Sequence, residues 1–278
     1  MSVLPELAGV RHDYLDAGGL RMHVALAGAD AAPPVLLVHG WPQHWWCWRK
    51  VLGPLAENHR VIAVDLRGHG WTERTAGGYE KEQLTGDLLA LLDAMGLDKV
   101  TWIGHDWGAY SGFLAALRSP ERIERMLALS IPHPWTPRDP RLLAVLLAYQ
   151  GPLSLPVIGP RVSDPLLRRL LQAGRGADRL GAEDVERFAS RTPPATTVAM
   201  YRSFLTRDLP AAARGRFAGK RLGVPTRLLA GARDLVTTGL RPGPVPRQPN
   251  LSVEVVPGVG HWIPEQRPDL IVDWARRV

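Results

Sequence analysis

Apolar and polar positions alternate in two short stretches near the start of the chain. Residues 11–15 and 20–25 share this two-residue period, and Ala17-Gly18-Gly19 separates them, so they predict an antiparallel β-hairpin. Unbroken apolar runs rich in Val, Ile and Leu follow, a pattern typical of strands buried on both faces of a parallel sheet. These predicted strands are 34–38, 61–64, 100–103 and 126–129.

Helical periodicity separates the buried strands. The clearest case places five apolar residues on one face of a helix: Leu84, Leu88, Leu91, Leu92 and Met95. A second helix is expected over 109–117. Strands that alternate with helices indicate an α/β fold, in which a mostly parallel sheet carries helices on both faces.

The alternation stops after Ser130. Residues 133–215 contain no strand-like run, only helical pieces cut by prolines and glycines. Strand-like runs resume at 225–229 and 253–256, and a last helix is expected over 268–278. A helical insert between two blocks of parallel strands is best explained as a cap over one edge of the sheet.

The chain therefore divides into two predicted parts. Residues 1–132 and 216–278 form the α/β core, whose sheet has eight strands when the hairpin is included. Residues 133–215 form the helical cap, or lid.

Composition and charge exclude several classes of protein. The formal net charge is +7, but the Lys and Arg residues are scattered, without the basic and aromatic stripe that follows a nucleic acid. The single cysteine, Cys47, excludes an internal disulfide and argues against a thiolate metal site. The longest apolar run, 142–149, is far shorter than the ~20 residues of a membrane span. Residues 1–10 lack the pattern of a signal peptide.

From these observations we expect a cytoplasmic protein. Neither nucleic acid nor a membrane is an expected partner, and the composition leaves monomer and homodimer both open.

Candidate chemistry begins at Gly104-His105-Asp106-Trp107-Gly108, which joins a predicted strand to a predicted helix. Small residues on both sides of a central residue are the pattern of a nucleophile elbow, which exposes that residue above the sheet. The central residue is usually serine, but here it is Asp106. His105 is expected to point away from the pocket. The alternative interpretation is that Asp106 only caps the following helix.

An aspartate at this position changes the reaction that the site favours. A carboxylate is a poor nucleophile toward esters, but it can displace a leaving group at a saturated carbon and form an alkyl ester of the enzyme. Water must then hydrolyse that ester. The substrates that fit such a cycle are epoxides and haloalkanes.

A base and an acid are expected after the nucleophile, each at the end of a strand. Strand 225–229 leads to Asp234, which predicts the acid, and strand 253–256 leads to His261, which predicts the base. The alternative for Asp234 is a surface turn. Any single histidine is more often structural, but His261 lies in a glycine-framed position after the last strand.

Hydrolysis of an ester on Asp106 needs two backbone N–H groups that face the developing oxyanion. We expect them from Trp107, the residue after the nucleophile, and from Trp41 in His39-Gly40-Trp41-Pro42, which follows the strand at 34–38. The Trp41–Pro42 peptide bond is a candidate for the cis form because a fixed turn is required there.

Taken together, these motifs resemble the epoxide hydrolases of the α/β-hydrolase superfamily, a branch with an aspartate nucleophile that is related to the haloalkane dehalogenases. The resemblance spans most of the core and includes the tryptophan-rich stretch after Pro42. The segments that carry it are His39-Gly40-Trp41-Pro42, Trp45-Trp46-Cys47-Trp48, Asp65-Leu66-Arg67-Gly68-His69-Gly70, Gly104-His105-Asp106-Trp107-Gly108 and Gly260-His261-Trp262.

This resemblance implies two tyrosines of the cap as acids that protonate the epoxide oxygen. Tyr149 in Ala148-Tyr149-Gln150 and Tyr201 in Met200-Tyr201-Arg202 match the order and setting of the family's tyrosines. A phenol is a competent acid toward an opening alkoxide. The alternative is that both tyrosines pack between helices. The remaining tyrosines lie outside the cap and are expected to be structural: Tyr14, Tyr79 and Tyr110.

Aromatic residues near these loops suggest a pocket for a small apolar epoxide, with water as the second substrate and without a cofactor or a metal. The predicted substrate pocket consists of His39, Pro42, Trp107 and Trp262. Core packing is an equally good explanation for Trp46 and Trp48.

Three rival functions share parts of this pattern. A haloalkane dehalogenase would use Asp106, Asp234 and His261, but it needs two N–H donors for a halide; only Trp107 and Trp135 are candidates. A fluoroacetate dehalogenase would need an arginine after the nucleophile to bind the substrate's carboxylate. A non-catalytic binding protein would have no reason to keep nucleophile, base, acid and oxyanion loop together.

Overall fold

The computed structural model describes residues 4–136, 140–173, 179–237 and 240–277. The strands are β1 (Arg11–Asp16), β2 (Arg21–Ala27), β3 (Pro34–Val38), β4 (Arg60–Val64), β5 (Val100–His105), β6 (Ile123–Leu129), β7 (Thr226–Gly231), β8 (Gly243–Val245) and β9 (Gln248–Val256). The α-helices are α1 (Arg49–Ala56), α2 (Lys81–Ala94), α3 (Trp107–Arg118), α4 (Pro140–Ser154), α5 (Gly159–Leu171), α6 (Ala182–Ala189), α7 (Pro194–Ser203), α8 (Leu209–Ala213), α9 (Ile263–Gln266) and α10 (Pro268–Arg276). Short 3-10 helices are η1 (Trp45–Trp48) and η2 (Pro120–Arg122), and η4 (Phe204–Asp208) is a π-helical turn.

All strands in the described residues belong to one sheet in the order β1-β2-β4-β3-β5-β6-β7-β9-β8. The alternating pattern correctly predicts the antiparallel pairing of β1 with β2. The apolar runs correctly predict parallel pairing from β4 through β3, β5, β6 and β7 to β9. Strand β3 lies between β4 and β5, so the chain order reverses there. Loops that follow β3 and β5 therefore meet at a switch point, where α/β sheets place their binding sites.

The part of the chain that the structure describes contributes nine strands to the sheet, so the expected number of eight is wrong. The additional strand, β8, pairs antiparallel with β9 at one edge of the sheet. It is three residues long and contains Pro244, so it is too short to show an alternating pattern. Proline lacks an N–H donor and is tolerated in such an edge strand.

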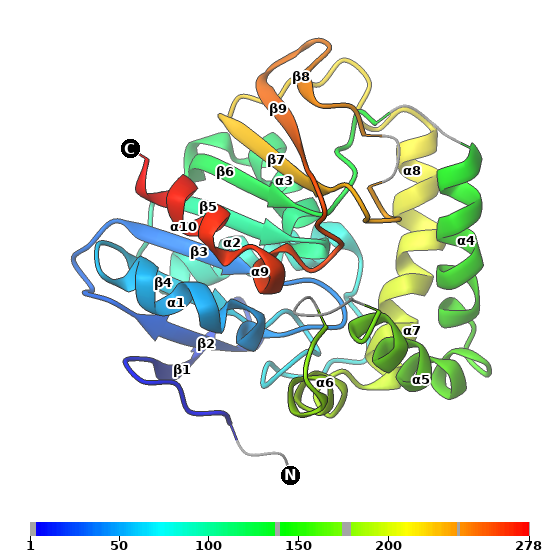
Figure 1. The fold of residues 1–278 in the computed structure, drawn as a ribbon, viewed down its shortest axis with the longest axis horizontal. Helices are drawn as coiled ribbons and strands as arrows, with labels where there is room; N and C mark the ends of the chain where they lie inside the picture. The colour runs from blue at the N-terminus through cyan, green and yellow to red at the C-terminus, as the bar shows by residue number, and fades with distance from the viewer. Residues whose placement is uncertain (1–3, 137–139, 174–178, 238–239, 278) are drawn as a thin grey trace.

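Helices cover both faces of the sheet, with α1 and α10 on one side and α2 and α3 on the other (Figure 1). The predicted apolar face of α2 is buried, because Leu84, Leu88 and Leu91 are at most 1% exposed. Side chains of the central strands fill the space between the sheet and these helices. The sheet is thereby held rigidly enough to position the loops at its carboxyl edge.

Helices α4 to α8 come between β6 and β7 and lie beyond the carboxyl ends of the parallel strands (Figure 1). The helix content expected for 133–215 is present in the residues that the structure describes there, with η4 between α7 and α8. The function of this segment as a cap stays a prediction. No helix in the described part of the chain is long and apolar enough to cross a membrane.

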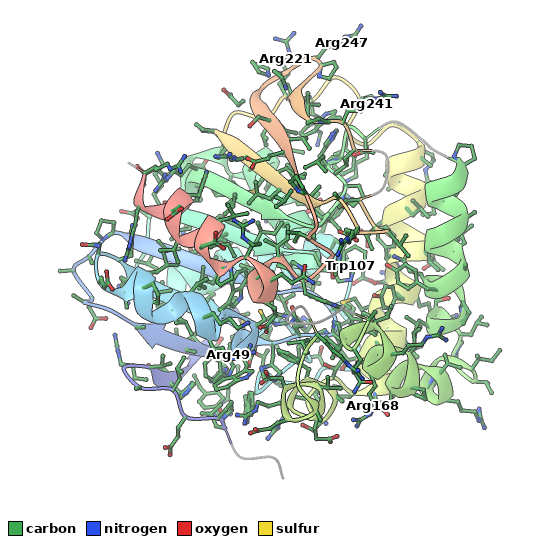
Figure 2. The ribbon with its side chains drawn as sticks, in the orientation of Figure 1. Arg49, Trp107, Arg168, Arg221, Arg241 and Arg247 are labelled. Carbon is green, nitrogen blue, oxygen red and sulfur yellow. The ribbon has the colours of Figure 1, made fainter. Side chains whose placement is uncertain are left out.

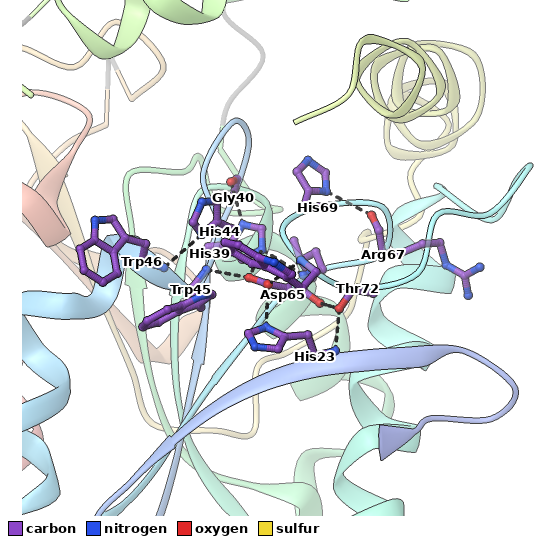
Figure 3. A network of polar contacts seen from close by, with 12 residues as sticks. His23, His39, Gly40, His44, Trp45, Trp46, Asp65, Arg67, His69 and Thr72 are labelled. Atoms are coloured by element: carbon purple, nitrogen blue, oxygen red, sulfur yellow. Dashed lines mark hydrogen bonds and ion pairs between the residues drawn. The ribbon is translucent and has the colours of Figure 1, made fainter. Parts of the chain in front are cut away.

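A buried carboxylate connects the loops that follow β3 and β4 (Figure 3). Asp65 accepts hydrogen bonds from the backbone N–H groups of Trp45 (2.7 Å) and Trp71 (3.0 Å), and it bonds to Nδ1 of His23 (2.7 Å). Burial opposes its charge, but neighbouring histidines, His23 above all, hold the pKa of Asp65 below its usual range. This charged anchor fixes the loops that approach the candidate nucleophile.

Close packing between α3 and the end of β3 generates a prediction about stability. A Cβ atom at Gly108 would lie 2.1 Å from the carbonyl oxygen of Val38, which is backbone and cannot move aside. Gly108→Ala should therefore lower the free energy of unfolding by about 1–3 kcal/mol. Urea denaturation, followed by circular dichroism, measures this change.

Gly86 provides the matched control because it lies within α2, where the nearest atom to its would-be Cβ is a side-chain nitrogen of Arg118 at 3.9 Å, an ordinary contact. Gly86→Ala should raise stability by about 0.5–1 kcal/mol through helix propensity alone. Equal effects of the two substitutions would contradict the close contact between α3 and β3.

Candidate active site

The turn between β5 and α3 holds Asp106 in a strained backbone conformation, with φ of 50° and ψ of −119°. Residues with a side chain rarely adopt a positive φ, and such strain is typical of functional turns. Two glycines permit it. A Cβ at Gly104 would lie 2.5 Å from the backbone N of Ala109, and Gly108 contacts Val38 as described above. The turn has the geometry of a nucleophile elbow.

The side chain of Asp106 faces the loop after β3 and does not cap α3. It makes no capping hydrogen bond with the helix. Its Oδ2 accepts the backbone N–H of Trp41 at 3.1 Å, and the backbone N–H of Trp107 also donates to the carboxylate. A Cβ at Gly40 would lie 2.5 Å from Asp106, so only glycine permits this approach. The two amides expected to form an oxyanion hole therefore face the candidate nucleophile.

Burial raises the pKa of Asp106 to about 6. The charge of His261 and the hydrogen bonds from the amides of Trp107 and Trp41 act in the opposite direction and limit this rise. Asp106 is consequently ionised at neutral pH although it is only 7% exposed. A carboxylate with few water molecules around it is well suited to attack a carbon atom.

His39 fixes the peptide unit that carries the N–H group of Trp41. Its Nε2 accepts the backbone N–H of Leu66 at 2.9 Å, so the proton lies on Nδ1, which donates to the carbonyl oxygen of Gly40 at 2.9 Å. Burial lowers the pKa of His39 to about 3, which keeps the ring neutral.

The peptide bond between Trp41 and Pro42 is cis, as anticipated. The indole Nε1 of Trp41 donates to Thr197 in α7 at 2.9 Å.

His261 and Asp234 form a hydrogen-bonded pair at the ends of β9 and β7. Nδ1 of His261 lies 3.1 Å from Oδ2 of Asp234. Asp234 is 3% exposed and also accepts the N–H of Val236 (2.9 Å) and the hydroxyl of Thr237 (3.0 Å), so it is more than a surface turn. Burial opposes a charge on His261, but Asp234 outweighs it and raises the pKa of His261, with a contribution from Asp106.

His105 has a structural position, as expected. Its Nε2 bonds to the carbonyl oxygen of His261 at 2.9 Å, and burial lowers the pKa of His105 to about 3. The neutral ring thereby supports the loop that carries His261. Within the described residues, no group of three or more His, Cys, Asp or Glu side chains is arranged to hold a metal ion.

Tyr149 from α4 and Tyr201 from α7 lie together beside Asp106. Their ring centroids are 6.0 Å apart, and the ring of Tyr201 also contacts those of Trp41 (5.2 Å) and Trp107 (6.1 Å). Burial raises the pKa of both phenols, with Asp106 adding to the effect, so both stay protonated. Nε2 of Gln150 donates to the hydroxyl of Tyr149 at 2.8 Å, which leaves the tyrosine's own proton available for donation.

A cavity of about 690 Å³ opens onto Asp106 and Tyr149. Most of its wall is apolar and comes from α4, α8, the end of α3 nearest the elbow and the loop after β6. Its lining consists of Asp106, Trp107, Tyr110, Ile131, Pro132, His133, Pro134, Thr136, Pro140, Leu143, Leu147, Tyr149, Gln150, Phe204, Leu209, Pro210, Ala212, Ala213, Phe217 and Val236. Figure 2 shows Trp107 in the interior, between the sheet and the helices of the 140–213 segment.

Among the four residues predicted for the substrate pocket, only Trp107 belongs to this lining. His39 is fully buried behind the Trp41 loop, and the carbonyl oxygen of Pro42 accepts the hydroxyl of Thr192. Trp262 packs on His261 and donates its Nε1 to the carbonyl oxygen of Leu170 at 3.2 Å. The tryptophans of η1 are buried in the core, which agrees with the packing explanation.

Several residues of the site escaped the sequence analysis. Tyr110, expected to be structural, lines the cavity, as do His133 and Gln150. A histidine between two prolines directly after a strand is a signal that could have identified His133. Lys81 is completely buried against the face of Trp107, although a lysine at the start of a helix normally indicates an exposed position.

The fold and the arrangement of this site define the class of the protein, which is a hydrolase. The sequence model of the alpha/beta hydrolase fold matches residues 33–268, so the chain belongs to the α/β-hydrolase family.

Two relatives align with nearly the whole chain. The AB hydrolase superfamily protein YfhM of Bacillus subtilis is 29% identical over 281 residues, covering 95% of this chain and 96% of the relative. Epoxide hydrolase A of Mycobacterium tuberculosis is 29% identical over 301 residues, covering 91% and 92%. The crystal structure of epoxide hydrolase VrEH1 from Vigna radiata is similar with a TM-score of 0.80 and 27% identity, covering 96% of this chain and 97% of that one.

The pair of Asp234 and His261 generates a prediction about protonation. Because the charge of Asp234 is what raises the pKa of His261 against burial, Asp234→Asn should lower that pKa by about 1–3 pH units. NMR titration of the histidine ring protons measures it. The exposed Asp98→Asn serves as control and should leave the titration of His261 unchanged. An unchanged pKa in Asp234→Asn would show that the pair does not interact in solution.

Proposed function

We propose that this protein is an epoxide hydrolase, which converts a small apolar epoxide and water into a vicinal diol. One observation carries the proposal: a buried carboxylate at the elbow, Asp106, and a protonated phenol, Tyr149, line the same apolar cavity. The chemistry needs a nucleophile for carbon and an acid for oxygen at one place. Similarity to epoxide hydrolase A of M. tuberculosis over nearly the whole chain supports it.

In the first step, an oxygen of Asp106 attacks the less hindered carbon of the epoxide. The bond between that carbon and the epoxide oxygen breaks, and the oxygen takes the proton of Tyr149 or Tyr201. The products are a hydroxyalkyl ester on Asp106 and a phenolate. Attack requires the ionised carboxylate, so this step should slow as pH falls through the pKa of Asp106 at about 6.

In the second step, a water molecule attacks the ester carbonyl carbon of Asp106 and gives one proton to His261, which Asp234 orients. The amides of Trp41 and Trp107 stabilise the oxyanion. When the intermediate collapses, the diol oxygen leaves with the proton from His261. Asp106, now a carboxylic acid, releases its proton, which returns to the phenolate. The cycle consumes only water and epoxide, and it uses no cofactor.

The shape of the chain around the cavity supports the same proposal. The helical segment that contains α4, α7 and α8 supplies both tyrosines and much of the apolar wall. In this proposal 133–215 is the cap: it excludes water from the reacting atoms and presents the acids to the epoxide. An apolar wall favours an apolar substrate.

A haloalkane dehalogenase is supported less well. That reaction needs a second N–H donor beside Trp107 to hold the departing halide. The candidate at the start of the cap, Trp135, donates its indole N–H to the carbonyl oxygen of Lys220 at 3.2 Å. It is therefore already bonded, whereas Tyr149 lies at the position that suits an epoxide oxygen.

Removal of the base should trap the covalent intermediate. In His261→Gln the first step proceeds and the second slows by roughly 10²–10⁴-fold, the usual contribution of a general base. After incubation with styrene oxide, mass spectrometry should find one substrate mass added on Asp106. The parent protein, assayed beside it, should release diol from styrene oxide but no halide from a bromoalkane.

The control is Asp106→Asn, which should neither form the adduct nor produce diol. An adduct on another residue, or diol formation by His261→Gln at the parent rate, would contradict the covalent route. Halide release in preference to diol would favour the dehalogenase.

A further inference from the structure

A turn in the cavity wall carries buried polar atoms that the proposed cycle does not use. Residues His133 and Thr136 follow β6, and the backbone N–H of Thr136 donates to the carbonyl oxygen of His133 at 2.9 Å, which closes the turn. Both residues line the cavity. Nδ1 of His133 and Oγ1 of Thr136 have no hydrogen-bond partner among the described residues, and His133 is only 7% exposed.

The surroundings of this turn make the unpartnered atoms conspicuous. Pro132 and Pro134 flank His133, and Ile131 and Phe217 are among the apolar residues that form the same wall. Buried polar groups in proteins are nearly always hydrogen-bonded, and an exception in a cavity wall indicates a position for a ligand group. Two such exceptions lie on one four-residue turn.

The charge of the cavity restricts the chemistry of that group. Burial lowers the pKa of His133 to about 4, so the ring is neutral and offers one N–H donor and one lone pair. Thr136 can also donate and accept. None of the described residues that line the cavity is a lysine or an arginine, so the site has no counter-charge for a carboxylate. A hydroxyl group, which both donates and accepts, matches these partners.

We propose that the turn of His133 and Thr136 is a substrate subsite that binds a hydroxyl group carried by the epoxide at a distance from its ring. The proposal rests on the proposed function and narrows its substrate class to apolar epoxides with a remote alcohol. The apolar wall binds the carbon skeleton, and the turn fixes which carbon of the epoxide meets Asp106.

Matched substrates test the subsite. Terminal epoxyalkanes of stepwise increasing chain length are compared with the same compounds carrying an alcohol at the far end. At one chain length the alcohol should raise kcat/KM by roughly 5- to 10-fold, the effect of one good hydrogen bond. Thr136→Val, which has the same shape without the hydroxyl, should abolish the preference. The exposed Thr206→Val should retain it.

Binding separates failure of the subsite from failure of the proposed function. Calorimetry with Asp106→Asn measures affinity for the same pairs without turnover. A preference for the alcohol that Thr136→Val removes supports the subsite even where no epoxide is hydrolysed. If neither binding nor kcat/KM favours the alcohol at any length, the subsite is wrong, while diol formation would leave the proposed function intact.

A second, independent observation concerns Lys81 at the start of α2. Its side chain is completely buried, and its Nζ lies 4.2 Å from the ring centroid of Trp107 and 6.0 Å from that of Phe204. Nζ also donates to the carbonyl oxygen of Tyr79 at 3.4 Å. A desolvated ammonium on an indole face is held by cation–π attraction.

Charges around Lys81 come from several elements. Asp208 in η4, Asp106 at the elbow and Glu80 before α2 favour its ammonium form, while the neighbouring His69 is neutral because burial lowers its pKa to about 4. Burial lowers the pKa of Lys81 to about 8, against these carboxylates. The side chain is thus cationic at neutral pH.

We infer that Lys81 is a positioning residue, which holds Trp107 and its amide in place and favours the ionised form of Asp106. It acts through Trp107 and through its charge, without contact with the substrate. The inference rests on Asp106 as the nucleophile. It also gives the indole of Trp107 a cation–π contact with Lys81 on one face of the ring.

Lys81→Met tests this inference because methionine keeps the apolar bulk and removes the charge. Loss of the cation should raise the pKa of Asp106, so the acid limb of single-turnover ester formation should move to higher pH. A decline of the parent rate above about pH 8 should disappear. The exposed Lys99→Met should show neither change. If Lys81→Met folds but both limbs of its pH–rate profile match those of the parent, the inference is overturned.

Carbon-13 NMR of labelled aspartate gives a readout that does not depend on turnover. The Asp106 carboxyl resonance, identified by its absence in Asp106→Asn, should titrate at higher pH in Lys81→Met than in the parent. An identical titration would overturn the inference even if no epoxide is ever hydrolysed.

Discussion

The site depends on one close approach between two loops, the elbow after β5 and the loop after β3. Asp106 adopts a positive φ, and its side chain reaches the backbone N–H of Trp41 because Gly40 has no Cβ in the way. Gly108 packs directly on the end of β3 and sets the height of the elbow above the sheet. The two amides expected for an oxyanion hole, those of Trp41 and Trp107, take their position beside Asp106 from this contact.

Burial around that contact determines the charges. It raises the pKa of Asp106 and lowers those of His39 and His105, so two histidines serve as neutral supports of the loops. His261 is the exception, because Asp234 stabilises its charged form against burial. The same physical cause, desolvation, therefore separates supporting histidines from a histidine that is suited to move a proton.

The cavity combines an apolar wall with a small number of polar groups at defined places. Asp106 and Tyr149 lie at the proposed reaction centre, and Gln150 donates a hydrogen bond to the phenol. Elsewhere in the wall, the turn of His133 and Thr136 carries polar atoms that the proposed cycle does not use. An enzyme with such a wall distinguishes substrates by the position of a polar group more than by size, because an unpaired polar group in the wall penalises a mismatch.

Sequence alone determined the α/β fold, the antiparallel hairpin, the elbow at Asp106 and the pairing of Asp234 with His261, because strand ends and glycines leave local patterns. It did not reveal β8, which is too short for a period, nor the cavity lining, since Pro42 and Trp262 bond to other segments. Lys81 and His133 gained their surroundings only when α4, η4 and the loop after β6 packed together. Local patterns specify elements, whereas the contacts of a side chain depend on segments that are distant in sequence.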